Sequence, residues 1–208
     1  MQKLDTKTKI LNAAEQLFAE RGFADTSLRL ITSQAEVNLA SVNYHFGSKK
    51  ELIQAVLARY LEVFVPSLEQ TISSLNSQGD RYTQHQVFSC LIEPLLALNT
   101  FRHRGTTMFL QLLGRGYIES QGHLRWFITT HYGDIMVAFN DAVRQANPHL
   151  SKAEIFWRLH FTLGTVVFTM ASSNALTDIA KSDFNQDVDI EDLIRRLIPF
   201  ISAGVSAP

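Results

Sequence analysis

Residues 26–52 read TSLRLITSQAEVNLASVNYHFGSKKEL, and the fold prediction starts from them. Thr26 or Ser27 can cap a helix over the apolar residues that follow. Residues 37–39 then form a short turn, and residues 40–46 form a second, very short helix that a glycine ends. Two short helices joined by so tight a turn and packed on a third helix are typical of a helix-turn-helix.

The flanks of this stretch supply the helices on either side of it. The apolar residues of a first helix recur at helical spacing on one face: Ile10, Ala14, Leu17 and Phe18. Downstream, Ser48-Lys49-Lys50-Glu51 has the form of a capping box and opens a fourth helix. We expect this fourth helix to connect two domains over about residues 48–65 and to stop near Pro66.

The remaining chain predicts longer helices, with breaks near residues 77–80, 114–122, 147–148 and 183–189. A capping box that begins at Ser151 opens an apolar segment that we expect to reach about Ala180. Asp189 caps the last helix, which we expect to end at about Ala203.

Few segments alternate as strands do, so the sequence predicts an all-α fold. A three-helix helix-turn-helix domain occupies residues 1–50, and a second helical domain occupies residues 51–208.

Composition narrows the function classes. With 19 Lys+Arg and 20 Asp+Glu the net charge is -1, which excludes a uniformly basic binder but not a local basic site. The only cysteine, Cys90, excludes an internal disulfide and a multi-thiolate zinc site. The chain has no signal-peptide apolar region and no run of about 18–20 apolar residues, so we expect a cytoplasmic protein without a membrane partner.

The outward face of the third helix carries the side chains that we expect to contact double-stranded DNA. Val42 and Phe46 point inward, which leaves small and polar residues toward the major groove. Asn43 can donate to and accept from an adenine edge, and Lys49 lies in a first helical turn, where the dipole also favours a phosphate. The predicted DNA-binding residues are Ser27, Arg29, Ala40, Ser41, Asn43, Tyr44, His45 and Lys49. Taken singly, each could instead be a packing or solvated surface residue.

Three blocks resemble, in order and at the right spacing, the N-terminal domain of the TetR family of transcriptional regulators: residues 13–23 (AAEQLFAERGF), 26–31 (TSLRLI) and 44–52 (YHFGSKKEL). The resemblance implies a DNA-binding homodimer whose C-terminal domain binds a ligand and carries the dimer face. Two residues depart from the family pattern. Glu36 stands where a helix-ending glycine is usual, and Asn43 stands where tyrosine is frequent, so base preference does not carry over.

A narrower resemblance is to the PsrA-type fatty-acid-responsive regulators. It is carried by residues 37–40 (VNLA) and 42–50 (VNYHFGSKK) and continues into residues 53–56. It implies a regulator of fatty-acid metabolism genes that a long-chain fatty acid or acyl-CoA releases from DNA. We favour a repressor on a palindromic operator. The alternatives are a TetR-family regulator of another apolar effector, such as a drug or an aromatic compound, and a lipid-binding protein without a DNA function.

Apolar stripes in the second domain are the candidates for an effector tunnel. Methionine and aromatic side chains can line a tunnel for an acyl chain, although the same residues can fill a core. The predicted ligand-binding residues are Met108, Phe109, Leu112, Trp126, Met136, Phe139, Phe161 and Phe168. The candidate donors for an acidic head group are Arg102, His103, Arg104, His123, Arg125, His131 and Arg158.

Catalytic and metal-binding patterns are absent from the sequence. The histidines show no His-x-x-x-His pair, so we predict no metal and no other cofactor. The chain has no Gly-x-Ser-x-Gly elbow, no phosphate-binding glycine loop and no His-Glu-x-x-His, so we predict that it is not an enzyme. Cys90 lies in an apolar helix, as a buried structural thiol does.

The predicted dimer face lies in the last part of the chain. Residues 151–180 are apolar around much of their circumference, and the last helix adds a second apolar face. By the family resemblance, two helices per subunit form a twofold four-helix interface, whereas a buried core helix in a monomer is the alternative. Two recognition helices must reach grooves about 34–36 Å apart. Effector entry would move the connecting helix and so shift the separation of the two heads, which weakens DNA binding.

Overall fold

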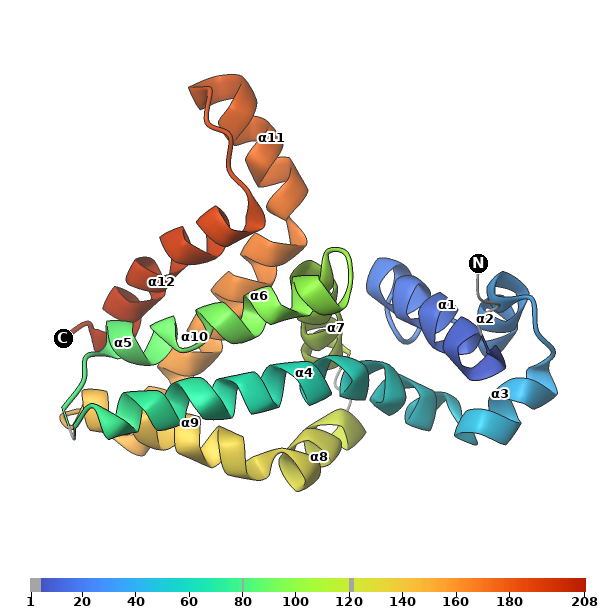
Figure 1. The fold of residues 1–208 in the computed structure, drawn as a ribbon, viewed down its shortest axis with the longest axis horizontal. Helices are drawn as coiled ribbons and strands as arrows, with labels where there is room; N and C mark the ends of the chain where they lie inside the picture. Colours follow the sequence, from blue (N-terminus) through green and yellow to red (C-terminus); the bar gives the residue numbers. More distant parts are fainter. Residues whose placement is uncertain (1–4, 80, 120–121) are drawn as a thin grey trace.

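The computed structural model describes residues 5–79, 81–119 and 122–208, and the regular elements within them are α-helices. They are α1 (Thr6–Arg21), α2 (Leu28–Ala35), α3 (Leu39–Phe46), α4 (Lys49–Ser77), α5 (Gln84–Ser89), α6 (Ile92–Phe101), α7 (Gly105–Ile118), α8 (Gly122–His131), α9 (Gly133–Ala146), α10 (Lys152–Ala171), α11 (Ser173–Phe184) and α12 (Ile190–Ser206). The predicted all-α fold is confirmed. Helices α1–α3 gather at one end of the long axis, and α4 runs from them along the rest of the molecule (Figure 1).

Helices α1–α3 form the head. Asp5, Ser27 and Asn38 cap them, each by accepting a hydrogen bond from the backbone amide three residues further on. The inward side chains Val42 and Phe46 are buried, as predicted, and hold α3 against the other two helices. The turn between α2 and α3 is short, so the head has the predicted helix-turn-helix arrangement.

Helix α4 is longer than the sequence predicts. It has 29 residues, passes through Pro66 and ends at Ser77, so the expected extent of about 48–65 is wrong. Pro66 and Glu62 are both exposed, so the helix hydrogen bond that the proline removes lies on the solvent side of α4. Buried side chains continue the apolar face of the helix beyond the proline: Leu68, Ile72 and Leu75. The connecting helix therefore reaches the far end of the body.

Two other boundaries differ from the prediction. Helix α7 continues through Gly114, because this glycine serves close packing: a Cβ there would lie 2.4 Å from Val167 Cγ1 on α10. Helix α10 ends at Ala171 rather than near Ala180, because Ser172 leaves helical geometry (φ -95°, ψ 8°) before α11 begins.

The other predicted boundaries agree with the structure. Breaks follow Ser77 and Ala146, and Ser151 and Asp189 cap α10 and α12. The last helix runs to Ser206, three residues beyond the expected end.

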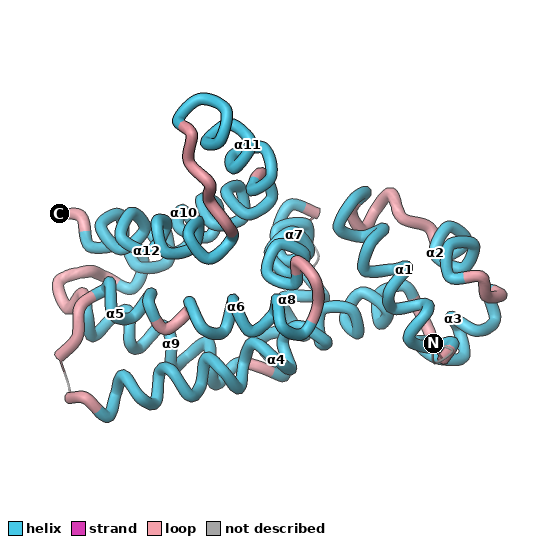
Figure 2. The backbone as a smooth tube through the Cα atoms, turned by 45° about the horizontal axis from the view of Figure 1, so that its top comes forward, coloured by secondary structure: helices cyan, strands magenta, loops and turns pink. Residues whose placement is uncertain are grey.

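The body, α4–α12, packs around the long α4. Helices α8 and α9 lie on one side of α4, and α5 and α6 lie on the other (Figure 1). Helix α12 lies alongside α10, and α11 projects from this pair (Figure 2). Among the described residues, no helix combines the length and apolar character that a membrane crossing requires.

Candidate functional site

The first part of the site is the solvent face of the head. The predicted DNA-binding residues that are exposed are Ser27, Arg29, Ala40, Asn43 and Tyr44. Tyr44 leaves 86% of its surface free, and its ring meets the neighbouring His45 ring edge-on, with centroids 5.1 Å apart. The remaining three, Ser41, His45 and Lys49, are half-buried. The structure thus brings the polar side chains of α3 together on its outward side.

Three of these polar groups already have partners within the head, and one of them is the Ser27 hydroxyl, which accepts from the Leu30 amide at 3.2 Å. The Ser41 hydroxyl donates to Asn38 Oδ1 at 2.9 Å, which leaves its lone pairs for an outside donor. Lys49 Nζ donates to the Ala24 carbonyl at 3.3 Å, which holds the start of α4 against the turn between α1 and α2. The backbone carbonyl and a phosphate both accept from an ammonium, so Lys49 can serve both at once.

The second part of the site is a cavity of about 690 Å³ in the body. Its walls come from α4, α7, α8, α9 and α10, and they are mostly apolar: Leu57, Leu113, Leu124, Ile128, Met136, Ile155 and Leu159. Charged side chains also line it: the basic Arg125, Arg144 and Lys152, and the acidic Asp141. Its volume lies within the usual range for small-molecule sites, about 300–1,000 Å³. An apolar space with a few cations suits an amphipathic anion.

The structure separates the predicted ligand-binding residues. Met136 lines the cavity. Phe109 and Leu112 are buried in the core, where the Phe109 ring packs on Tyr60 and Phe64, and Phe139 stacks on Phe88 with centroids 6.1 Å apart. The others are the half-buried Met108 and the exposed Trp126, Phe161 and Phe168. Of the predicted set, the cavity lining includes Met136 alone, and the ligand role of the others stays a prediction.

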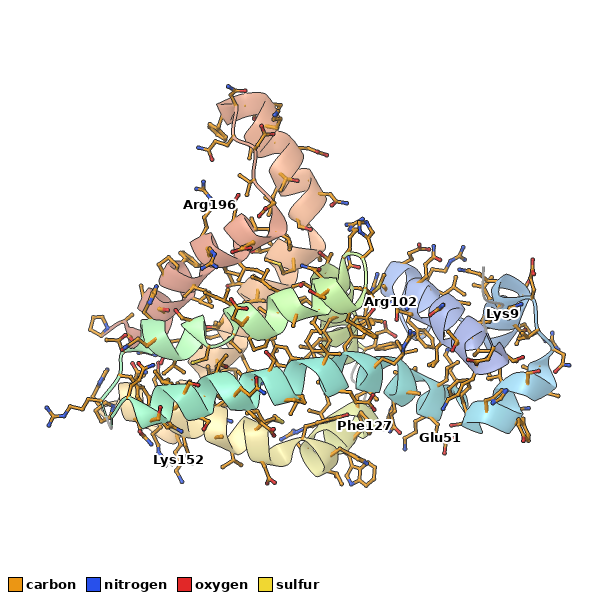
Figure 3. All side chains as sticks on the ribbon, viewed as in Figure 1. Lys9, Glu51, Arg102, Phe127, Lys152 and Arg196 are labelled. Carbon is orange, nitrogen blue, oxygen red and sulfur yellow. The ribbon has the colours of Figure 1, made fainter. Side chains whose placement is uncertain are left out.

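The predicted head-group cations are also divided. Arg125 lines the cavity, whereas Arg102 pairs with Glu15 and Arg158 pairs with Glu154. Sequence reasoning missed Arg144 and Lys152, which flank the turn between α9 and α10. Their signal was local: both stand next to the predicted break at residues 147–148, where two helix ends meet. Lys152 lies at the end of the body away from the head (Figure 3).

Two family models match the chain. Residues 10–56 match the model described as "Bacterial regulatory proteins, tetR family", and residues 89–204 match "Tetracyclin repressor-like, C-terminal domain". The chain belongs to the TetR family. The resemblance of the N-terminal blocks is thereby confirmed, and the second match extends the family to the body of this TetR-family regulator. The narrower likeness to the PsrA-type regulators stays a prediction.

Curated relatives of this TetR-family chain are transcriptional regulators, in line with the prediction that it is not an enzyme. The probable HTH-type transcriptional regulator YttP of Bacillus subtilis (strain 168) is 32% identical over 108 residues, which cover 52% of this chain and 50% of YttP. This chain spans about half the length, or less, of the first curated relatives that it matches.

Solved structures share the fold over nearly the whole TetR-family chain. A TetR-like transcriptional regulator from Rhodococcus sp. RHA1 superposes with a TM-score of 0.61 at 17% identity, with 100% of both chains covered. The fatty acid degradation regulator FadR from Bacillus halodurans gives a TM-score of 0.50 at 13% identity, with 97% and 96% covered. Identities this low establish a shared fold and nothing finer.

A buried ion cluster joins the head of this TetR-family regulator to its body. Glu15 on α1 is 3% exposed, and it accepts from Arg59 of α4 at 3.1 Å and from Arg102, just after α6, at 2.8 Å. Arg102 faces α1 across the junction (Figure 3). Burial lowers the pKa of Arg59, and the Glu15 carboxylate opposes that shift. The sequence did carry a signal here, because Glu15 interrupts the apolar face of the first helix.

A second polar contact joins α7 to the head. The Glu119 carboxylate accepts from the backbone amides of Phe23 at 2.9 Å and Ala24 at 2.6 Å, through one oxygen each. Arg115 Nη2 donates to the Glu20 carbonyl at 3.3 Å. Nothing in the sequence pointed to these contacts, because they join positions 95 and 96 residues apart.

Within residues 5–79, 81–119 and 122–208, no group of three or more His, Cys, Asp or Glu side chains is placed to hold an ion.

Proposed function

We propose that this TetR-family chain is a ligand-responsive repressor that binds palindromic operator DNA as a homodimer. Residues 1–50 contact DNA, and residues 51–208 hold the effector and the dimer face. A long-chain fatty acid or acyl-CoA occupies the cavity and releases the protein from DNA, which controls genes of fatty-acid metabolism. The observation that carries the proposal is an apolar cavity lined by cations and walled by α4, the helix that enters the head.

Base recognition falls to the exposed face of α3. Asn43 supplies the side chain with both a donor and an acceptor, which suits an adenine edge. Lys49 and Arg29 contact phosphates, and Tyr44 and His45 contact the backbone of the DNA. Ala40 is small and exposed, so α3 can approach the floor of the groove closely.

The charges of the cavity favour an anionic amphiphile over a neutral drug or aromatic compound. Arg144 pairs with Asp141 at 3.0 Å. Arg125 and Lys152, in contrast, have no ion pair among the described residues, so their charges are available to a ligand. A carboxylate or thioester head group at Lys152 and Arg144 would leave the acyl chain to run toward Leu57 and Leu124.

The homodimer is supported by an exposed apolar stripe on α10 and α12. Trp157, Phe161 and Phe168 are 55%, 67% and 68% exposed and follow the heptad spacing of a helix–helix seam. Phe200 on α12 is 68% exposed. Large apolar surfaces of this kind mark interaction sites, and a twofold pairing of α10 and α12 with a second copy would cover them.

The acidic head group is tested by comparing palmitate, palmitoyl-CoA and hexadecanol as ligands in isothermal titration. We expect palmitate or palmitoyl-CoA to bind at least about tenfold more tightly than the alcohol, since a charge-assisted contact is worth more than a neutral one. Lys152→Met should remove most of that preference, while Lys181→Met, a change on α11 outside the cavity, should not. Equal binding of acid and alcohol by the wild type would contradict an anionic effector and favour a neutral one.

A further inference from the structure

Helix α7 touches both the cavity and the head, through neighbouring turns. Leu113, Gly116 and Tyr117 line the cavity. Two residues past Tyr117, Glu119 caps the end of the helix and binds the turn that follows α1. A displacement of the last turns of α7 by a ligand would therefore reach the head directly.

The Glu119 carboxylate accepts from two backbone amides of the head that follow the end of α1. These are the amides of Phe23 and Ala24, and each donates to a separate oxygen of the carboxylate. Hydrogen bonds to an ionised acceptor are about twice as strong as neutral ones. Arg115, one turn earlier on α7, donates to the Glu20 carbonyl at the end of α1. Both ends of the turn are thus bound by α7.

The turn is shaped to admit the carboxylate. Gly22 has φ 87°, which favours glycine, and a Cβ at Gly22 would lie 2.4 Å from Glu119 Oε1. Gly116 on α7 also allows a close approach, here between the cavity wall and the head. A Cβ at Gly116 would lie 3.1 Å from Leu124 Cδ1, in the cavity wall, and 3.9 Å from Phe23 Cε2, in the core of the head. The backbone of α7 at Gly116 therefore separates the cavity from the buried Phe23 ring.

The α7 contact differs in kind from the passage of α4 into the head. Helix α4 is continuous with the helix-turn-helix, so it can bend or tilt but cannot detach. The Glu119 contact consists of hydrogen bonds between segments far apart in the chain, so it can break and re-form. A contact that is made in one state and lost in another is what an effector needs in order to shift a conformational equilibrium.

We propose that Glu119 is a positioning residue. We call its carboxylate, together with the Phe23 and Ala24 amides that donate to it, the latch. The latch fixes the head on the body in the effector-free, DNA-binding state. A ligand in the cavity presses on α7 at Leu113, Gly116 and Tyr117 and releases the latch. The inference rests on the proposed function for the direction of the response, but the latch itself does not depend on the identity of the effector.

The first experiment needs no effector. Hydrogen exchange is followed at the amides of Phe23 and Ala24 in the wild type, Glu119→Gln and Glu119→Ala. Glu69→Gln is the control for charge, because Glu69 is exposed and has no ion pair with another described residue. We expect exchange to rise in the order Glu, Gln, Ala, by about tenfold or more for Ala, because the glutamine keeps one acceptor oxygen. Amides inside α1 should exchange as in the wild type. Equal exchange at the turn in all four proteins would overturn the latch.

The second experiment measures coupling to DNA. The affinity of the same four proteins for one duplex selected from a random pool is measured with and without palmitoyl-CoA. We expect Glu119→Ala to weaken effector-free binding at least about threefold, although Glu119 lies in the body, and to reduce the ratio of the two affinities. The effector-free affinity of Glu119→Gln should lie between those of the wild type and Glu119→Ala, and that of Glu69→Gln should match the wild type.

The outcomes of the second experiment distinguish the two proposals. If palmitoyl-CoA leaves wild-type DNA binding unchanged, the proposed effector is wrong, and the effector-free affinities still decide the latch. If all four proteins bind DNA alike without effector, Glu119 does not position the head, whatever the effector is.

Discussion

Glu36 shows how a single backbone conformation limits the stability of the head. It ends α2 in the left-handed region (φ 54°, ψ 47°), which costs a residue with a Cβ about 1–2 kcal/mol. We expect Glu36→Gly to raise the free energy of unfolding by about 0.5–1 kcal/mol, because glycine adopts this conformation without strain but gains entropy when unfolded. Urea denaturation measures the change. Glu36→Ala is the matched control, since it removes the charge and keeps the strain; equal stability of the two variants would contradict the prediction.

Asn43 and Lys49 separate base recognition from phosphate binding at the residue scale. Asn43→Ala should change which bases are preferred, because the exposed amide is the group that matches a base edge. Lys49→Ala should weaken all sequences alike and reduce the slope of log affinity against log salt by about 1. Selection from a random duplex pool at two salt concentrations measures both effects. Equal loss on every sequence in the Asn43 variant would show that it does not contact bases.

Elements were predictable where the signal was local. The caps at Ser48, Ser151 and Asp189 were placed by a polar side chain before an apolar run, and each accepts the expected amide. For α2 the sequence left Thr26 and Ser27 open, and the structure has Ser27 as the cap. Helix ends were harder to predict, since a glycine or a proline can either end a helix or lie within it, and packing determines which. The glycine in α7 that faces α10 is the clearest case, because the sequence alone cannot distinguish close approach from a helix end.

The element α8 carries a histidine that should make the fold sensitive to acid. Burial, and secondarily the charge of Lys50, lower the pKa of His123 below its ordinary value, and Nε2 has no hydrogen-bond partner among the described residues. The unfolded chain takes up this proton near pH 6.5 and the folded chain only at lower pH, so stability falls as pH drops below about 6.5. Denaturation midpoints from pH 7.5 down to about 5 should fall less in His123→Gln than in the wild type. His103→Gln, a change at an exposed histidine, is the control and should behave as the wild type. If the midpoint falls with pH equally in His123→Gln and in the wild type, His123 is not the cause.

At the scale of the whole molecule, the exposed stripe on α10 predicts the oligomeric state. Phe161→Glu and Phe168→Glu place charges at the centre of the proposed twofold seam, so we expect each variant to sediment as a monomer where the wild type sediments as a dimer. Analytical ultracentrifugation distinguishes these states. Trp126→Glu changes an apolar residue on α8 that is 59% exposed, and it should leave the dimer intact. A wild-type protein that is monomeric at all concentrations would contradict the homodimer.

The candidate site was only partly predictable from the sequence. The DNA-binding face depends on contacts between residues close in the sequence, whereas the cavity depends on contacts between distant ones. The head is a local structure, so the outward residues of α3 follow from helical spacing and the short turn. The cavity joins five helices, so sequence patterns identified apolar stripes but not which of them face an open space. Phe109 and Leu112 are of the residue types that line apolar tunnels, but they lie in the core. Arg144 and Lys152 line the cavity because the turn between α9 and α10 places them there.

The central claim is that one small molecule in the body controls DNA binding by the head. The most direct test is fluorescence anisotropy of the purified protein on the DNA upstream of its own gene, titrated with palmitoyl-CoA and with palmitate. We predict tight, sequence-specific binding without ligand and release by one of the two at micromolar concentrations. Tight binding that neither compound disturbs would contradict the fatty-acyl effector, and the absence of any preference for upstream DNA would contradict the account of the head itself.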